Sequence, residues 1–351
     1  MACQTVGVYS ETAPGERRVA VVPEAVRLIL ELGLEVLVEA EAGRRAYFPD
    51  SAYICAGARI VSRSELFDAA HMLIGVRPPN IASTHRFRAG QALICLLQPL
   101  YMPDTIRRWA DQGLTAIAAD LVPRTPGRAQ LMDALSSQDQ VAGYQAILTA
   151  ADTFGRCLAE PPPGAEIGPP TQILVLGRGS AGREAALTAR RLGAIVRVCE
   201  ACEGSCPDIA RRARGIDIIV VTAEIPGQRP PILVPARSVR TMRPGSVIVD
   251  TTASAFGRAV ELAEPNAIRV VEPGVTVIGD DNLASKTPTS ASAAYATSIA
   301  ALLAHLVSGG ALSIDLTDPI QSEVVVTHDR GVLNHAVWQR ILDQISLAGL
   351  P

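Results

Sequence analysis

The sequence predicts an α/β protein with two doubly wound parallel-sheet domains joined by long helices. Short apolar runs typical of strands alternate with amphipathic stretches typical of helices, an order that favours parallel sheets covered on both faces. A Pro/Gly-rich connector, EPPPGAEIGPP, divides the chain into two such runs. Two lobes of this kind enclose a cleft, and we expect cofactor and substrate to bind there.

The composition narrows the class of protein. The 351 residues suffice for two domains, and 48% hydrophobic with 19% charged residues is typical of a soluble globular chain. A net charge of −3 without a basic block argues against nucleic acid as a partner. The longest apolar run near the end, IAALLAHLV, is too short to span a bilayer, and the first residues lack a signal-peptide core. We expect a cytoplasmic protein without membrane insertion.

The first lobe reads as a series of strands with a helix near its start. The helix, PEAVRLILELG, is closed by Gly33. The predicted strands are residues 4–10, 34–41, 71–77, 91–99 and 114–120. A long helical stretch then runs from about Gly127 to about Phe154, ahead of the connector.

The second lobe begins with a strand, a glycine turn, a helix and a strand within residues 171–200. Later predicted strands are residues 216–223, 246–252, 267–272 and 275–279. A second long helix, from about Ser290 to about Leu306, leads into the tail.

The glycine turn has the spacing of a dinucleotide-binding loop. Gly177, Gly179 and Gly182 form G-x-G-x-x-G after a strand and at the start of a helix. Gly177 permits the turn, Gly179 lets the backbone approach a pyrophosphate, and Gly182 lets the helix pack against the strand. The helix N-terminus, with Ser180 and Ala181, offers N–H groups to the phosphate. The alternative is a glycine-rich turn without a ligand.

An acid at the end of the next strand completes this pattern. Glu200 follows Gly182 by 18 residues, where a carboxylate accepts hydrogen bonds from ribose hydroxyls and repels a 2′-phosphate. This favours NAD as the cofactor. Arg178 and Arg197 lie near the same edge and leave NADP open.

Three cysteines surround this acid. Cys199, Cys202 and Cys206 have a spacing that soft metal ligands use. A structural zinc site needs four ligands, and no further Cys or His lies nearby, so we expect no metal. A reactive thiol at Cys202 or Cys206 remains an alternative.

Several stretches together resemble a known family. They are VGVYSETAPGERRVAVVPEAV, AYFPDSAYICAGARIV, RAQLMDALSSQDQVAGYQAIL, the glycine loop, VVTAEIPGQRPPILV, MRPGSVIVD and GDDNLASKTPTSASAAYATSIAALL. The chain resembles alanine dehydrogenases and the NAD(H)-binding alpha subunits of nicotinamide nucleotide transhydrogenases. The resemblance implies two Rossmann-like domains, one of residues 1–126 plus 309–351 and one of residues 127–308. It also implies a bound dinucleotide and a homodimer or higher homo-oligomer.

The resemblance assigns residues to a substrate site. Arg18 falls where the family binds a substrate carboxylate, and a guanidinium can pair bidentately; the alternative is a surface ion pair with Glu16 or Glu24. Arg77 falls at the position of a substrate-binding lysine. Gln98 stands where alanine dehydrogenases carry a catalytic histidine, and Ser254 where they carry an aspartate. Acid–base residues for aminating pyruvate are therefore absent at both positions. The alternative for Arg77 is a solvated arginine at the end of a strand.

The resemblance also assigns residues to the cofactor. The loop beside the nicotinamide corresponds to Arg128, Gln130, Asp133, Ser136 and Ser137. Further cofactor positions are Thr222, Ala223, Asn282 and Leu283. The alternative for the first group is that these polar residues cap the long helix.

We predict an NAD(P)-dependent oxidoreductase that transfers hydride to or from a small carboxylate-bearing substrate, of the amino- or imino-acid type, and not alanine dehydrogenase itself. Arg18, Arg77, Gln98 and Asp133 are the candidate catalytic residues; Asp133, Lys286 or a water molecule would supply the proton. A redox-neutral use of bound NAD stays open. Two alternatives are a soluble transhydrogenase-alpha-like subunit acting in a complex and a non-catalytic nucleotide sensor.

Overall fold

The protein consists of two compact units. The structure, a computed structural model, describes residues 4–80, 87–125, 127–159, 169–200, 213–223 and 227–348. Unit 1 comprises Met1–Gln138 and Pro288–Pro351, and unit 2 comprises Asp139–Thr287. The domain bounds expected from the sequence differ in two segments, because they assign residues 127–138 and 288–308 to the second domain.

Unit 1 is built on an eight-stranded sheet. Its strands are β1 (Thr5–Val8), β2 (Glu35–Glu39), β3 (Arg59–Val61), β4 (Met72–Ile74), β5 (Ala92–Cys95), β6 (Thr115–Ala118), β15 (Val325–His328) and β16 (Gly331–Val332). Their order is β16-β15-β6-β5-β4-β1-β2-β3. The six strands β1 to β6 are parallel and have the order 3-2-1-4-5-6 of classical dinucleotide-binding sheets, while β15 and β16 extend the sheet as an antiparallel hairpin.

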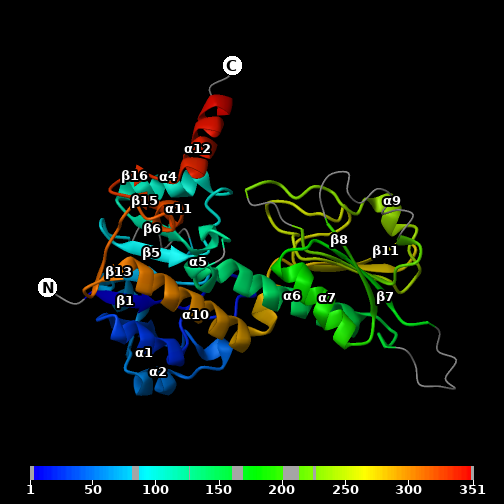
Figure 1. Ribbon diagram of the computed structural model, residues 1–351, viewed down its shortest axis with the longest axis horizontal. Helices are drawn as coiled ribbons and strands as arrows, with labels where there is room; N and C mark the ends of the chain where they lie inside the picture. Colours follow the sequence, from blue (N-terminus) through cyan, green and yellow to red (C-terminus); the bar gives the residue numbers. More distant parts are fainter. Residues whose placement is uncertain are drawn as a thin grey trace. The chain divides into compact units, whose positions relative to one another are not determined.

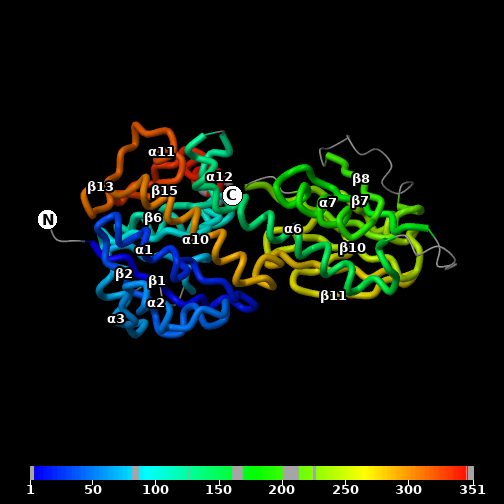
Figure 2. The backbone as a smooth tube through the Cα atoms, turned by 60° about the horizontal axis from the view of Figure 1, so that its bottom comes forward, coloured from blue at the N-terminus to red at the C-terminus, as the bar shows by residue number. Residues whose placement is uncertain are grey.

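Helices cover both faces of this sheet (Figure 1). They are α1 (Pro23–Glu31), α2 (Asp50–Ala56), α3 (Arg63–Ala69), α4 (Pro103–Gln112), α5 (Arg128–Met132), α10 (Pro288–Leu306), α11 (Gln321–Val324) and α12 (His335–Ala348), with the start of α6 (Ala134–Thr153). One buried cluster joins one sheet face to α1 and α10, and another joins the opposite face to α3, α4 and α12. The helices α1 and α10 lie side by side in both backbone views (Figure 2).

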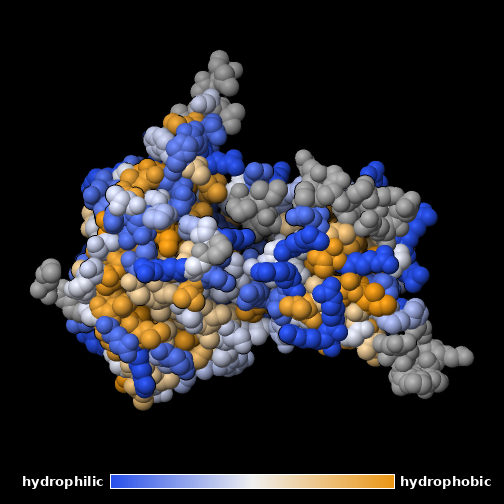
Figure 3. All heavy atoms as spheres, viewed as in Figure 1, coloured by the Kyte–Doolittle hydropathy of each residue, from blue (hydrophilic) through white to orange (hydrophobic). Residues whose placement is uncertain are grey.

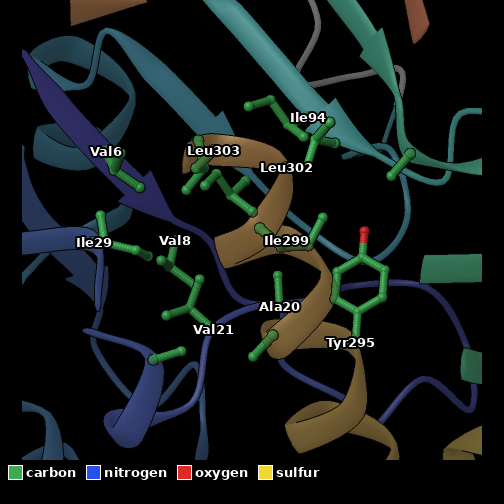
Figure 4. Packing of buried hydrophobic residues seen from close by; sticks show 14 of the residues in the cluster. Val6, Val8, Ala20, Val21, Ile29, Ile94, Tyr295, Ile299, Leu302 and Leu303 are labelled. Carbon is green, nitrogen blue, oxygen red and sulfur yellow. The ribbon is translucent and has the colours of Figure 1, made fainter. Parts of the chain in front are cut away.

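The packing beneath α10 explains why a segment so far from β1 in the sequence belongs to the same unit. Ile299 and Leu303 of α10 are fully buried against Val6 and Val8 of β1 and against Ile29 of α1 (Figure 4). Full burial of such side chains contributes about 1.5–3 kcal/mol each. The carboxy-terminal segment therefore completes the core of unit 1.

Unit 2 is built on a six-stranded sheet. Its strands are β7 (Gln172–Leu176), β8 (Ile195–Cys199), β9 (Ile218–Val221), β10 (Val247–Asp250), β11 (Ala267–Val271) and β12 (Val275–Gly279). Their order is β11-β12-β10-β9-β7-β8, and all neighbours are parallel except β11 and β12. The order reverses between β7 and β9, which makes the carboxyl ends of these strands the expected ligand position.

Helices and loops also cover both faces of the second sheet. Buried alanines of α6 and α7 (Ser180–Arg191) pack on one face, and residues around α9 (Ala236–Val239) pack on the other. The close approach of α6 to α7 depends on Gly143, where a Cβ atom would lie 2.1 Å from the carbonyl oxygen of Ala181. The predicted α/β class with two Rossmann-like sheets is confirmed.

The structure corrects one expectation and adds elements. The single helix expected over residues 127–154 is wrong, because α5 and α6 meet at Asp133, whose backbone leaves the helical conformation (φ −72°, ψ 80°). The strand β3 and the β15–β16 hairpin were not expected from the sequence. Two smaller strands, β13 (Val307–Ser308) and β14 (Ala311–Leu312), form a hairpin after α10. Short 3-10 helices are η1 (Arg44–Ala46), η3 (Ala119–Leu121) and η4 (Leu283–Lys286).

The surface carries scattered apolar side chains (Figure 3). Leu28 of α1 and Ile54 of α2 are 50% and 59% exposed. Single exposed apolar residues are common on folded proteins, so they indicate no site by themselves. No helix in the described ranges is long and apolar enough to cross a membrane.

Candidate functional site

The strand order of unit 1 places its charged residues together. The order reverses between β1 and β4, so the segments that follow these two strands lie at the same edge of the sheet. Glu11 follows β1, and its Oε1 accepts hydrogen bonds from the backbone N–H groups of Val76 and Arg77, which follow β4, at 2.6 and 3.3 Å. The carboxyl ends of the two strands are thereby joined by one carboxyl group.

Arg18 is held by the protein itself. Its Nε and one terminal nitrogen donate to the two carboxylate oxygens of Glu16 at 2.7 and 2.6 Å, and its other terminal nitrogen donates to Oε1 of Gln138 at 2.8 Å. The side chains of Arg18 and Glu16 are 5% and 0% exposed. Burial alone would raise the pKa of Glu16, but the hydrogen bonds and charge of Arg18 lower it to about 2. The ion pair foreseen as a surface pair is therefore buried.

Gln138 connects this ion pair to two helices. It belongs to α6, and its amide nitrogen donates to the carbonyl oxygen of Ala291 in α10 at 3.0 Å and to the hydroxyl of Ser137 at 3.1 Å. This role was not expected from the sequence. The available signal was the place of Gln138 in the conspicuous stretch RAQLMDALSSQ.

Arg77 is the accessible cation of the group. Its Nε lies 3.2 Å from Oε2 of Glu16, and its side chain is 30% exposed. Within the residues that the structure describes, neither terminal nitrogen has a hydrogen bond or an ion pair. A guanidinium with two free parallel donors can bind a carboxylate bidentately.

Buried aromatic side chains fix the segment that carries Arg77. The hydroxyl of Tyr9 donates to the carbonyl oxygen of Arg77, and the hydroxyl of Tyr295 donates to the carbonyl oxygen of Gly75 at 2.8 Å. Gly75 is required here, because a Cβ atom would lie 1.9 Å from the Tyr9 hydroxyl. Burial raises the pKa values of both tyrosines and of the neighbouring Cys95 thiol, so all three groups are neutral at neutral pH.

Gln98 lies at the carboxyl end of β5 in an unusual conformation. Its φ is +49°, a left-handed value that non-glycine residues seldom adopt. Its N–H donates to Asp120 at 3.0 Å, and Leu97 N–H donates to the other oxygen of that carboxylate at 2.8 Å. Strained backbone of this kind clusters at functional sites. The side-chain amide of Gln98 is exposed and cannot transfer a proton at neutral pH.

The polar residues at the start of α6 have capping roles. The carboxylate of Asp133 accepts a hydrogen bond from Ser136 N–H at 2.8 Å, which is N-cap geometry, and the Ser137 hydroxyl donates to Ala134 O at 2.7 Å. The capping alternative is therefore realised for these three residues. The exposed side chains of Arg128 and Gln130 make no hydrogen bond in the described part of the chain, so they are free to contact a ligand.

The glycine loop of unit 2 has the expected conformation. Gly177 adopts φ +123°, and a Cβ atom on Gly182 would lie 2.1 Å from the carbonyl oxygen of Gly177. A Cβ atom on Gly177 would lie 2.5 Å from the hydroxyl of Thr222, at the end of β9. Gly179 has open space around its Cβ position and is the N-cap of α7, followed by Ser180 and Ala181. The turn thus packs tightly on its own strands and leaves space in front of a helix N-terminus.

Glu200 follows the edge strand β8 beside this loop. Gly177 N–H donates to Cys199 O at 2.9 Å, which ties the end of β8 to the turn. Glu200, Arg178 and Arg197 are exposed. Cys202 and Cys206 lie outside the described residues. Among the residues that are described, no group of three or more His, Cys, Asp or Glu side chains is arranged like a metal site.

The remaining cofactor positions follow other strands of the same sheet. Thr222 and Ala223 come after β9 and are half-buried. Asn282 precedes η4, its N–H bonds to Asp280 at 2.9 Å, and Leu283 is 1% exposed. Lys286 forms an ion pair with Asp280 at 2.8 Å.

Asp250, at the end of β10, was not singled out in the sequence. It is fully buried and accepts four hydrogen bonds, from the N–H and hydroxyl of Thr252 and from the N–H groups of Ala259 and Val260. Burial raises its pKa against these bonds. It therefore shapes the loop that contains Ser254, whose hydroxyl accepts from Phe256 N–H at 3.1 Å.

Comparisons with known proteins agree with this architecture. Residues 7–142 match the model of the alanine dehydrogenase/PNT N-terminal domain, and residues 204–335 match that of the C-terminal domain. The first of the polypeptides that make up the NAD(P) transhydrogenase alpha subunit of Rhodospirillum rubrum is 32% identical over 95% of this chain and 98% of its own length. The chain belongs to the alanine dehydrogenase/PNT family.

Solved structures relate this family member to two kinds of protein. The transhydrogenase from Sinorhizobium meliloti superposes with a TM-score of 0.86 at 33% identity, covering 94% of this chain and 100% of that one. An L-alanine dehydrogenase superposes with a TM-score of 0.82 at 27% identity, covering 97% and 99%. The predicted family is confirmed.

Proposed function

We propose that the chain is an NAD(H)-binding subunit that exchanges hydride between its bound nicotinamide and a second nucleotide held by a partner. The glycine loop, Glu200 and the strand ends of unit 2 would bind the dinucleotide. Bound NAD(H) would supply the hydride. Arg128 and Gln130, whose side chains have no partner in the described part of the chain, would contact the nicotinamide portion.

The observation that carries this proposal is the state of Arg18. All three of its guanidinium nitrogens are engaged by Glu16 and Gln138 in the protein interior, so a substrate carboxylate would have to displace a buried ion pair. Gln98 offers no proton at the position of the family histidine. The near-complete match to transhydrogenase alpha subunits, at 32% identity in the Rhodospirillum protein, supports the same conclusion.

A hydride-exchange assay tests this proposal. The purified chain is mixed with NADH deuterated at nicotinamide C4, NADP⁺ and the NADP-binding domain of a transhydrogenase. We expect deuterium in NADPH only when both proteins are present. Absence of transfer, with NADH bound to the chain, would remove this function.

One observation favours a second candidate, an NAD(P)-dependent oxidoreductase acting on a small carboxylate. The two terminal nitrogens of Arg77 have no partner in the described part of the chain, and they would hold the substrate carboxylate. NADH oxidation with a panel of 2-oxo acids, with and without ammonium, tests this candidate. The variant Arg77→Gln should raise KM for an accepted substrate by at least about tenfold.

Assembly and cofactor choice complete the proposal. The predicted homodimer or higher homo-oligomer would form alongside the complex with a partner subunit. NAD is the proposed cofactor because of Glu200; Arg178 and Arg197 are the residues that would allow NADP.

A further inference from the structure

Four charged residues meet at the switch point of unit 1. Glu16 and Arg18 form the buried pair, Arg77 touches the same Glu16 carboxylate at 3.2 Å, and Glu11 bonds to the backbone of Arg77. Glu16 is ionised at neutral pH because its pKa is lowered, and arginines stay charged. Glu16, Arg18 and Arg77 together carry a charge of one positive unit. The charge of the whole group therefore depends on Glu11.

Glu11 is placed to hold a proton. It is 5% exposed, and its hydrogen bonds to Val76 and Arg77 both use Oε1. Its other oxygen, Oε2, has no donor in the part of the chain that the structure describes. Burying an ionised carboxylate with an unsatisfied oxygen is costly. Burial and the adjacent Glu16 charge raise the pKa of Glu11 to about 8, against the opposing effect of the two amides.

The surroundings of Glu11 offer no second cation that would keep it ionised. Besides Glu16, Arg18 and Arg77, the ionisable groups that face Glu11 are Tyr9, Cys95 and Tyr295. The last three are neutral at neutral pH because burial raises their pKa values. Arg18 already neutralises Glu16. The group is therefore left with one uncompensated positive charge, and Arg77 is its exposed member.

We propose that this cluster binds a single carboxylate anion at Arg77 together with one proton on Glu11, so that Glu11 determines whether the site accepts an anion. The inference rests on the role of Arg77 as a carboxylate anchor in the second candidate function, and it does not depend on which acceptor takes the hydride. Glu11 does not touch the ligand. It acts as a positioning residue through the charge of the site.

The sign of the pH dependence follows from linkage. A bound anion favours the protonated form of Glu11, so the Glu11 pKa is higher in the complex than in the free protein. Below about pH 7 Glu11 is already protonated in both states, and the Kd is constant. Above about pH 8, binding takes up a proton, and the Kd rises by up to about tenfold per pH unit.

Calorimetric titration of the full chain with propionate, from about pH 6 to about pH 9.5, tests the proposal; propionamide is the neutral control ligand. We expect wild-type Kd values to be flat at low pH and to rise above about pH 8, with proton uptake approaching one per propionate. Glu11→Gln, which imitates the protonated acid, should bind propionate with a Kd constant within about twofold over this range. Arg77→Gln should weaken binding by at least about tenfold at every pH.

Three results would overturn the proposal: a flat wild-type Kd, an unchanged slope in Glu11→Gln, or no propionate binding at about pH 6. NADH binding, measured on the same samples, separates these results from failure of the nucleotide function. If Glu11→Gln does not fold, carbon-13 titration of the wild-type Glu11 carboxyl replaces it. Propionate should move its midpoint upward, and an unmoved midpoint contradicts the proposal.

Discussion

Arg18 and Glu16, two residues apart in the chain, form a bidentate ion pair with nitrogen–oxygen distances of 2.7 and 2.6 Å and exposed fractions of 5% and 0%. Both side chains lose hydration on folding, so each depends on the other. Their pairing removes Arg18 from the surface that a substrate could reach. It also leaves Arg77 as the accessible cation at this sheet edge.

Removing one partner of this pair should strongly destabilise the protein. Glu16→Gln leaves the Arg18 charge buried without its counter-ion, and we expect a loss of about 3–5 kcal/mol in the free energy of unfolding. Urea denaturation measures this. The control is Glu41→Gln, which breaks the exposed pair of Glu41 and Arg44 and should cost less than about 1 kcal/mol. Equal losses in the two variants would contradict the buried pair.

Glu11 should give stability a recognisable pH dependence. Its pKa of about 8 in the folded protein exceeds the value of about 4.3 for an unfolded chain. Between these values the folded state holds one proton more, so the free energy of unfolding falls as pH rises, by up to about 1.4 kcal/mol per unit. Glu11→Gln lacks this contribution and should gain stability relative to wild type from about pH 5 to about pH 8. Parallel stability curves for the two proteins would show that Glu11 is ionised.

The glycine loop yields a prediction about packing. Gly182→Ala would place a Cβ atom 2.1 Å from Gly177 O and 2.9 Å from the Thr222 hydroxyl, so the turn must shift. We expect about 1–3 kcal/mol of destabilisation and NADH binding at least about tenfold weaker. Gly215→Ala, where nothing lies within 4 Å, is the matched control. Unaltered NADH affinity in Gly182→Ala would argue against this loop as the pyrophosphate site.

Glu200 should set the preference between the two dinucleotides. Glu200→Ala removes the carboxylate that would repel a 2′-phosphate and leaves Arg178 and Arg197 nearby in sequence. We expect the ratio of the NADPH Kd to the NADH Kd to fall by about tenfold, as measured by nucleotide fluorescence. Glu35→Ala, at an exposed position in unit 1, serves as the control. A ratio that does not change would place the ribose elsewhere.

The parts of the fold that depend on local sequence were predictable. The strand–turn–helix around Gly177 requires a particular glycine spacing, and the buried parallel strands appear as short apolar runs. The break at Asp133 was missed because apolar periodicity continues through it, although Asp with a serine three residues later is itself a helix-start pattern. The β15–β16 hairpin was missed for a related reason. Its turn residues, Asp329 and Arg330, both adopt positive φ without being glycine.

The site was predictable only where a family position carries a charged residue. Arg18 and Arg77 could be singled out, but their partners could not. Glu11 and Gln138 acquire their roles from contacts 65 and 120 residues away, and an isolated acid or amide in a loop has no local pattern that indicates burial. Non-local packing, which sequence periodicity does not encode, determines which arginine stays accessible.

Dinucleotide binding at the amino end of α7 is the central requirement of the proposed function, and Gly179→Ala tests it directly. Gly179 has φ −62° and nothing within 4 Å of its Cβ position, so alanine should leave the melting temperature nearly unchanged. An NADH fluorescence titration should show saturable wild-type binding with a Kd below about 1 mM and binding at least about tenfold weaker (about 1.4 kcal/mol) in the variant. Absence of saturable NADH binding by the wild type, or equal affinity in the variant, would contradict it.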